Sequence, residues 1–165
     1  MKDELLDIVD KYDKVIGQKF RSEIYLKKLS NFRVVNAFLI NKDGKLWIPR
    51  RAKNKRVFPL CLDASMGGHV ASGETYEEAL TRELMEELRI DVKHNQSEYI
   101  GSLNPHEHNT SAFMRVYLLK SKKTPNYNPN DFIESFWLFP KELLNRINFG
   151  DKGKDDLPII IKNLF

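Results

Sequence analysis

The stretch that decides the fold is GHVASGETYEEALTRELMEELRI, residues 68–90. It opens as a glycine-containing loop in which Thr75 can cap a helix, with Glu78 three residues later as in a capping box. Apolar residues then recur at intervals of three and four positions, at Tyr76, Ala79, Leu80, Leu84 and Leu88. This period predicts a helix from about Thr75 to Leu88 with one buried stripe.

Three glutamates, Glu83, Glu86 and Glu87, fall on the other side of this predicted helix. Like charges so close on one helix repel each other by a few tenths of a kcal/mol per pair, so something should offset them. One interpretation is a solvated acidic face, neutralised locally by Arg82 and Arg89. The other is a site for a hard cation, because Mg²⁺ takes oxygen ligands and is commonly held by a few carboxylates and a substrate phosphate.

The spacing of these residues resembles the signature of the Nudix hydrolases. That pattern is Gly, five residues, Glu, seven residues, Arg-Glu, an aliphatic residue, any residue, Glu-Glu, any residue, Gly and an aliphatic residue. Here the matching positions are Gly68, Glu74, Arg82, Glu83, Leu84, Glu86, Glu87 and Ile90. Arg89 stands where the family has glycine, a departure that concerns how the helix ends rather than the ligands.

The resemblance implies a role for each matching residue. The metal ligands would be Glu83, Glu86, Glu87 and the carbonyl of Gly68, with Mg²⁺ as the ion and Mn²⁺ as an alternative. Arg82 would orient Glu83 or Glu74 through an ion pair, and Glu74 would fix the loop. The implied chemistry is attack of water on a diphosphate phosphorus. The catalytic residues would be Glu86, Glu87, Arg82 and Glu134, the last from a later segment and otherwise an exposed strand residue.

Other residues bear on the substrate. Arg50 and Arg51 follow a predicted strand, where one can fork onto phosphate oxygens while the other faces solvent. His69 is a further candidate for substrate binding, although a single loop histidine more often only hydrogen-bonds its surroundings. His106 and His108 would suit a metal only if they lay on a strand, and a surface loop is the favoured interpretation.

Working outward from the helix, the pattern predicts a single domain over residues 1–165. It begins with a hairpin over Leu5–Phe20 and a short helix over Arg21–Leu29, which together make the N-terminal region 1–30. Residues 67–90 form the loop and helix of the signature. Further strands are predicted at Val34–Ile40, Leu46–Ile48, Tyr99–Leu103, Ala112–Leu119 and Phe132–Phe139, and helices at Lys141–Ile147 and Leu157–Leu164. Phe58–Gly68 should be an irregular or short extended passage that leads to a tight turn at Gly67-Gly68. We therefore expect an α+β fold, an α/β/α sandwich of the Nudix type with a mixed sheet and an N-terminal hairpin.

Composition limits the function classes. The chain has 165 residues and a formal charge of +4, a sign that suits an anionic substrate without identifying one. The resemblance implies that this substrate is a small-molecule diphosphate. No stretch reaches the roughly 18 to 20 apolar residues of a membrane span, so we expect a cytoplasmic protein. Cys61 is the single cysteine, which leaves no intrachain disulfide. Nucleic-acid binding is disfavoured as the main role, because basic and aromatic residues are not interleaved. A homodimer is compatible with the sequence.

Two alternatives to hydrolysis stay open. From Leu5 to about Leu144 the chain also resembles Nudix proteins related to isopentenyl diphosphate isomerase, which use a cysteine in a Cys-Gly-His triplet as an acid. The matching triplet here is Gly67-Gly68-His69. Gly67 stands at the cysteine position and has no side chain that could donate a proton. Phe32 and Arg33 stand where a metal histidine is expected in that enzyme. Both differences favour hydrolysis. The second alternative is a diphosphate sensor without turnover, which the intact glutamates disfavour.

Overall fold

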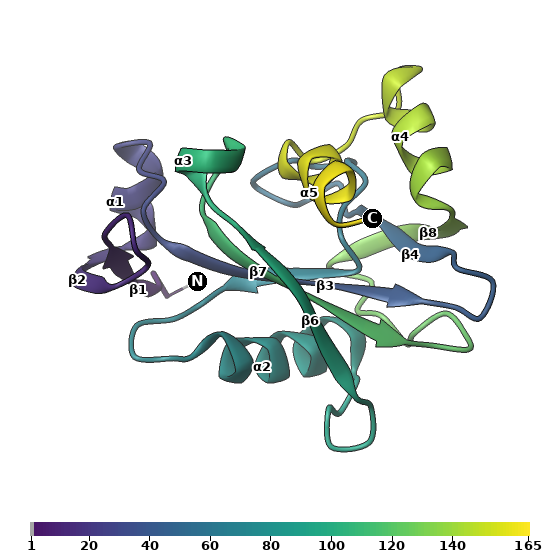
Figure 1. The fold of residues 1–165 in the computed structure, drawn as a ribbon, viewed down its shortest axis with the longest axis horizontal. Helices are drawn as coiled ribbons and strands as arrows, with labels where there is room; N and C mark the ends of the chain where they lie inside the picture. Colours follow the sequence, from purple (N-terminus) through teal and green to yellow (C-terminus); the bar gives the residue numbers. More distant parts are fainter. Residues whose placement is uncertain (1) are drawn as a thin grey trace.

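The computed structural model describes residues 2–165 and begins with a small two-stranded sheet. Strand β1 (Leu5–Val9) pairs antiparallel with β2 (Val15–Phe20), and helix α1 (Arg21–Leu26) follows directly. The predicted N-terminal hairpin and short helix are therefore confirmed, with the helix ending three residues earlier than expected. In Figure 1 this unit stands at one end of the molecule.

The main sheet has six strands in the order β6-β7-β3-β4-β8, with β5 also paired to β3. Strands β3 and β7 are parallel, and the other neighbouring pairs are antiparallel, so the sheet is mixed as expected. The six strands are β3 (Arg33–Ile40), β4 (Leu46–Arg51), β5 (Met66–His69), β6 (Ser97–Leu103), β7 (Phe113–Lys120) and β8 (Phe132–Leu138).

Helices cover both faces of this sheet. Helix α2 (Tyr76–Leu88) lies on one face, and α3 (Pro105–His108), α4 (Pro140–Asn148) and α5 (Asp156–Leu164) lie on the other (Figure 1). The apolar residues of α2 pack with Val35 and Ala37 of β3, whereas α5 packs with Phe38 of the same strand. Because successive strand residues face opposite sides, β3 serves both cores. The arrangement is the expected α/β/α sandwich.

The start of α2 is as well specified in the structure as in the sequence. The Thr75 hydroxyl accepts a hydrogen bond from the backbone N–H of Glu78 at 3.1 Å, and the Glu78 carboxylate accepts one from the N–H of Thr75 at 2.8 Å. This reciprocal capping box confirms the predicted N-terminus. At the other end, Arg89 takes a left-handed conformation with φ of 54°. The chain thus leaves the helix by the left-handed turn expected there.

Three local expectations need correction. Gly67 and Gly68 lie inside strand β5 rather than in a tight turn, because their backbone pairs with β3, so this end of the passage takes the extended alternative. His106 and His108 lie on the short helix α3, not in a loop or on a strand, because Asn104 caps the N–H groups that open it. Glu83 is buried, although the helical period put it on the solvent side.

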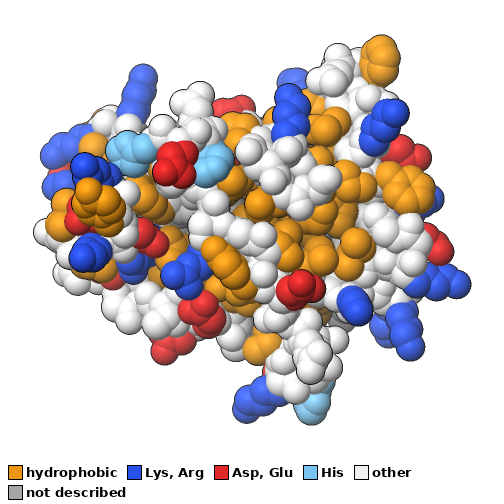
Figure 2. Space-filling view, viewed as in Figure 1, with side chains coloured by type: hydrophobic (Ala, Val, Ile, Leu, Met, Phe, Trp, Pro, Cys, Tyr) orange, Lys and Arg blue, Asp and Glu red, His pale blue; other side chains and the backbone are white. Residues whose placement is uncertain are grey.

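The surface itself is mixed in character. On the face drawn in Figure 2, hydrophobic side chains gather near the centre, while basic and acidic side chains are interspersed around the rim. A continuous basic surface of the kind that binds nucleic acid is thus not present on this face. Over residues 2–165, no helix is both long and apolar enough to cross a bilayer.

Candidate active site

A cleft of about 970 Å³ opens where β5 meets the N-terminal unit. Its lining comes from the start of the chain and α1, from the segment after β4, and from the acidic side of α2. Carboxylates and basic side chains share this space, the latter being Arg21, Lys28, Arg51, Lys55, Arg82 and Lys154. A cleft with both charges suits an anionic ligand that arrives with a cation.

Gly68 of β5 lets α2 approach the sheet closely. A Cβ atom added at Gly68 would lie 2.2 Å from the Glu83 carboxylate carbon, so the glycine leaves the space that the carboxylate fills. The N–H of Gly67 points away from β3 and donates to a Glu87 oxygen at 3.4 Å. The absence of a side chain at Gly68 and the backbone N–H of Gly67 therefore place the Glu83 and Glu87 carboxylates at the border of the cleft.

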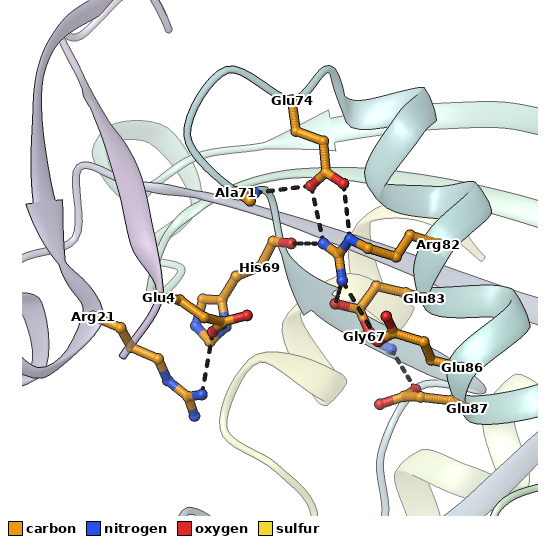
Figure 3. Close-up of polar contacts among 10 residues, drawn as sticks. All are labelled: Glu4, Arg21, Gly67, His69, Ala71, Glu74, Arg82, Glu83, Glu86 and Glu87. Atoms are coloured by element: carbon orange, nitrogen blue, oxygen red, sulfur yellow. Dashed lines mark hydrogen bonds and ion pairs between the residues drawn. The ribbon is translucent and has the colours of Figure 1, made fainter. Parts of the chain in front are cut away.

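Arg82 is the centre of an ion-pair network on α2 (Figure 3). Its guanidinium donates to both carboxylate oxygens of Glu74, at 2.8 and 2.9 Å, and to Glu83 at 2.7 Å. It also donates to the backbone carbonyl of His69 at 2.9 Å and lies 3.6 Å from Glu86. The hydrogen bond from Arg82 lowers the pKa of Glu74, which in turn accepts from the N–H of Ala71. The structure thus contains the expected pairing of Arg82, with both Glu83 and Glu74.

Two carboxylates of α2 are poorly compensated. Burial raises the pKa of Glu83 to about 7, and the ion pair with Arg82 offsets only part of that effect. Burial also raises the pKa of Glu87 well above its usual value, and the negative charges of Glu83, Asp63 and Asp131 act in the same direction. Ionised carboxylates in such a place need a cation, because unpaired buried charge is costly.

These residues fit a divalent cation in chemistry, although they do not form a finished coordination shell. Among residues 2–165, no three His, Cys, Asp or Glu side chains already converge as metal ligands. Glu83 and Glu86 are instead turned towards Arg82, and the Glu86 side chain is 59% exposed. The Glu83 carboxylate nevertheless lies against Gly68, where a side chain would displace it. Its oxygens are the hard donors that Mg²⁺ prefers. Arg82 contacts one oxygen of Glu83 and one of Glu86, which leaves the second oxygen of each carboxylate for an ion.

The predicted substrate-binding residues are divided between the cleft and the surroundings. Arg51 lines the cleft, but its guanidinium already donates hydrogen bonds to Asp63 at 2.8 Å and to the backbone carbonyls of Val57 and Phe58. His69 also lines the cleft, with Nε2 3.0 Å from the Tyr25 hydroxyl and Nδ1 3.4 Å from Glu4. Both residues shape the cleft walls and remain predictions as substrate ligands.

Arg50 and Glu134 lie outside the cleft. They sit opposite each other on β4 and β8 and form an ion pair, and Arg50 also forms a two-point contact with Asp151 at 2.8 and 3.2 Å. The structure therefore does not bring them to the predicted site, because strand alternation turns Arg50 away from the side that Arg51 takes. Asp131, three residues before Glu134, is the acidic residue of that segment that lines the cleft.

Several cleft residues escaped the sequence pattern. Asn36 on β3 lines the cleft, and Tyr25 and Phe32 pack around His69. The negative charges of Asp63 and Asp131 raise the pKa of Glu87. The polar Asn36 within the apolar strand VVNAFLI was the one local sign in the sequence that this strand contributes to the cleft. The two aspartates had no such signal, because each looks like an ordinary loop residue until the chain folds.

Comparison with known proteins identifies the relatives of this chain. The NUDIX domain family matches residues 30–157. An uncharacterised Nudix hydrolase of Nostoc sp. is 57% identical over 98% of this chain and 96% of its own length. A crystal structure of a Deinococcus radiodurans protein superposes with a TM-score of 0.93 at 44% identity, covering 98% of this chain and 99% of that one. An isopentenyl-diphosphate Δ-isomerase of Brevibacterium linens is 26% identical over 88% of this chain and 82% of its own length.

Proposed function

The chain belongs to the Nudix family of hydrolases, and from that membership we propose that it cleaves a diphosphate linkage in a small organic molecule with the help of Mg²⁺. The family in general hydrolyses nucleoside diphosphate derivatives and uses a divalent metal. The proposed substrate is accordingly a nucleoside diphosphate derivative or another organic diphosphate.

The observation that carries this proposal is the pair of α2 carboxylates at the cleft, the buried Glu83, which only Arg82 neutralises, and the half-buried Glu87. Glu83 and Glu87 both have a raised pKa, and both border a cleft that also contains Arg21, Lys28 and Lys154. A protein gains nothing in stability from such an arrangement alone, because burying carboxylates costs free energy. A divalent cation together with a diphosphate would complete the charge balance.

In the proposed reaction, Glu83, Glu86, Glu87 and the carbonyl of Gly68 would hold the ion. When bound, Mg²⁺ supplies charge neutralisation on the diphosphate and activates the attacking water. The water oxygen forms a bond to one phosphorus while the bridging P–O bond breaks, and a cleft carboxylate accepts the water proton. Arg82 contributes indirectly, since its fork keeps Glu74 and the loop before α2 fixed.

The isomerase alternative meets a steric obstacle as well as a missing acid. A Cβ atom at position 67 would lie 2.8 Å from the Asn36 side-chain oxygen, so a cysteine there collides unless Asn36 moves. The floor of this cleft is therefore shaped for glycine at 67. This supports hydrolysis over protonation of an alkene.

Phosphorus NMR tests the proposal. The purified protein and Mg²⁺ are incubated with a panel of nucleoside diphosphates, nucleotide sugars, dinucleotides and isopentenyl diphosphate. New monophosphate signals that disappear with a chelator are expected from at least one member. An allylic isomer with its diphosphate intact would favour the isomerase instead. No change in any substrate, with ligand binding retained, would favour the sensor.

A further inference from the structure

Two neighbouring apolar residues line the cleft without belonging to a hydrophobic core. Val57 and Phe58 lie in the loop after β4, and both are partly buried. Within residues 2–165, neither is part of the three hydrophobic cores or packs against one of them. In the same part of the chain, the Phe58 ring forms no aromatic pair. An apolar surface that the fold itself does not use, at the wall of a cleft, is available to a ligand.

The backbone of Phe58 is held in an unfavourable conformation. Its φ of 51° lies in the left-handed region, which a bulky side chain rarely adopts. Pro59 follows, and a residue before proline prefers an extended backbone. Such a conformation persists only where the surrounding structure imposes it, and conformations of this kind cluster at ligand-binding sites.

Arg51 is the residue that holds this part of the loop. Its guanidinium donates to the carbonyl of Val57 at 2.9 and 3.2 Å and to the carbonyl of Phe58 at 3.1 Å. Its Nη1 group donates to Asp63 at 2.8 Å. Asp63 also lines the cleft, and its negative charge acts on Glu87. Arg51 thus fixes Phe58 on the side of the cleft that contains Glu87.

The neighbours of Phe58 at the cleft wall are polar. Lys55 of the same loop forms an ion pair with Asp131, and the N–H of Ala52 donates to the Asp131 carbonyl at 2.8 Å. Lys55, Asp131 and Asn128 all line the cleft. One apolar surface bordered by polar side chains suits a planar heteroaromatic base, because the base has apolar faces and a polar edge. An isoprenoid chain would need apolar walls on several sides.

We propose that Phe58 is a specificity-determining residue whose ring stacks on the base of a nucleoside diphosphate derivative. The inference rests on the proposed function, because it places the diphosphate at the α2 carboxylates and the base beside the loop after β4. It selects nucleoside diphosphate derivatives from the two substrate classes proposed above. Stacking on a phenyl ring tolerates any base, so the choice among bases falls to the polar side chains around Phe58.

Calorimetric binding in the presence of Mg²⁺ tests the inference with ligands whose phosphorus atoms are joined by a carbon that is not hydrolysed. Methylenediphosphonate carries the diphosphate alone, and the α,β-methylene diphosphates of adenosine, guanosine, cytidine and uridine add a base. At least one of these four should bind about 10-fold or more tightly than methylenediphosphonate. Phe58→Leu should weaken that nucleoside ligand by about 10-fold and leave methylenediphosphonate unchanged. Phe58→Tyr keeps the ring and should bind both normally.

Leu60→Ala is the matched control. Leu60 lies in the same loop, has a φ of 62° and is 42% exposed, but it is not among the residues that line the cleft. This variant should bind both kinds of ligand normally. Leu60 also shows that leucine accepts a left-handed backbone in this loop. The melting temperature of Phe58→Leu should therefore be nearly unchanged, because the lost ring packs against no core.

The outcomes separate the inference from the function on which it rests. Suppose that methylenediphosphonate binds only with Mg²⁺ and that Glu87→Gln abolishes this binding, but that no nucleoside ligand binds more tightly. The base subsite is then wrong and the proposed function stands. The role of Phe58 is also wrong if Phe58→Leu weakens both kinds of ligand equally, or neither of them. Absence of any binding by the unaltered protein would overturn both proposals.

Discussion

Arg89 ends α2 in a backbone conformation that suits glycine better than arginine. Its φ of 54° lies in the left-handed region, which costs a residue with a Cβ atom about 1 to 2 kcal/mol. The family signature has glycine at this position. Its absence here leaves the turn intact, because the N–H of Arg89 still reaches the carbonyls of Leu84 and Met85.

We expect Arg89→Gly to stabilise the protein by about 0.5 to 1 kcal/mol, since relief of the left-handed strain exceeds the added entropy of the unfolded chain. Denaturation in urea measures the change. Arg89→Ala is the control and should leave stability nearly unchanged, because alanine keeps the Cβ atom. Equal gains from both variants would show that the arginine side chain, not the backbone, is unfavourable.

Gly68 is a second single residue with a large effect, in this case on the position of Glu83 in the site. Because a Cβ atom there would lie 2.2 Å from the Glu83 carboxylate carbon, Gly68→Ala must displace Glu83. Turnover with Mg²⁺ should fall by about 10-fold or more. Gly17→Ala is the matched change, since its added Cβ meets nothing within 4 Å. It should keep full turnover, and normal turnover in Gly68→Ala would contradict the proposed position of Glu83.

At the scale of elements, α2 was predictable because its cap, period and charges are all local. The strand β5 was not, because Gly67 and Gly68 carry no side-chain pattern and only pairing with β3 makes them a strand. The same limit applies to the cleft. The end of β4 carries two consecutive arginines, but only the alternation of side chains along the strand decides that Arg51 reaches the cleft and Arg50 does not.

Arg50 therefore has a structural role, in connecting neighbouring elements, rather than a role in the site. It links β4 to β8 through Glu134 and to the chain after α4 through Asp151. We expect Arg50→Gln to lower the free energy of unfolding by about 1 to 3 kcal/mol, because it leaves Asp151 with less positive charge. Turnover at a temperature well below the melting point should be unchanged. Glu134→Gln should likewise keep its turnover, and a large loss in either variant would return that residue to the site.

At the scale of the whole molecule, the buried carboxylates make stability depend on pH. Glu83 has a pKa of about 7 when folded and an ordinary value of 4.5 when unfolded. Between these values the folded protein holds a proton that the unfolded chain has lost, so raising the pH through this window destabilises the fold. Glu87 acts in the same direction. Glu74 has a lowered pKa, so its stabilising effect is already complete above about 4.5.

In a chelating buffer, stability should therefore fall by up to about 3 kcal/mol between pH 4.5 and 7 on account of Glu83. Saturating Mg²⁺ should remove this decline, because a bound cation favours the ionised carboxylates. Urea denaturation across this range measures it, and Glu83→Gln should flatten the slope. If stability instead rises over the same window without metal, burial does not outweigh the Arg82 ion pair at Glu83, and the raised pKa of Glu83 is wrong.

The central proposal is that the Glu83 and Glu87 carboxylates of α2 serve a metal-dependent hydrolysis. The most direct measurement is the steady-state turnover, with saturating Mg²⁺, of whichever panel substrate releases monophosphate. The double variant with Glu83→Gln and Glu87→Gln should lose about 10³-fold or more in turnover while folding at least as stably as the unaltered protein. Glu77→Gln, on the same helix but outside the cleft, should turn over normally. A folded double variant that retains turnover would contradict the claim.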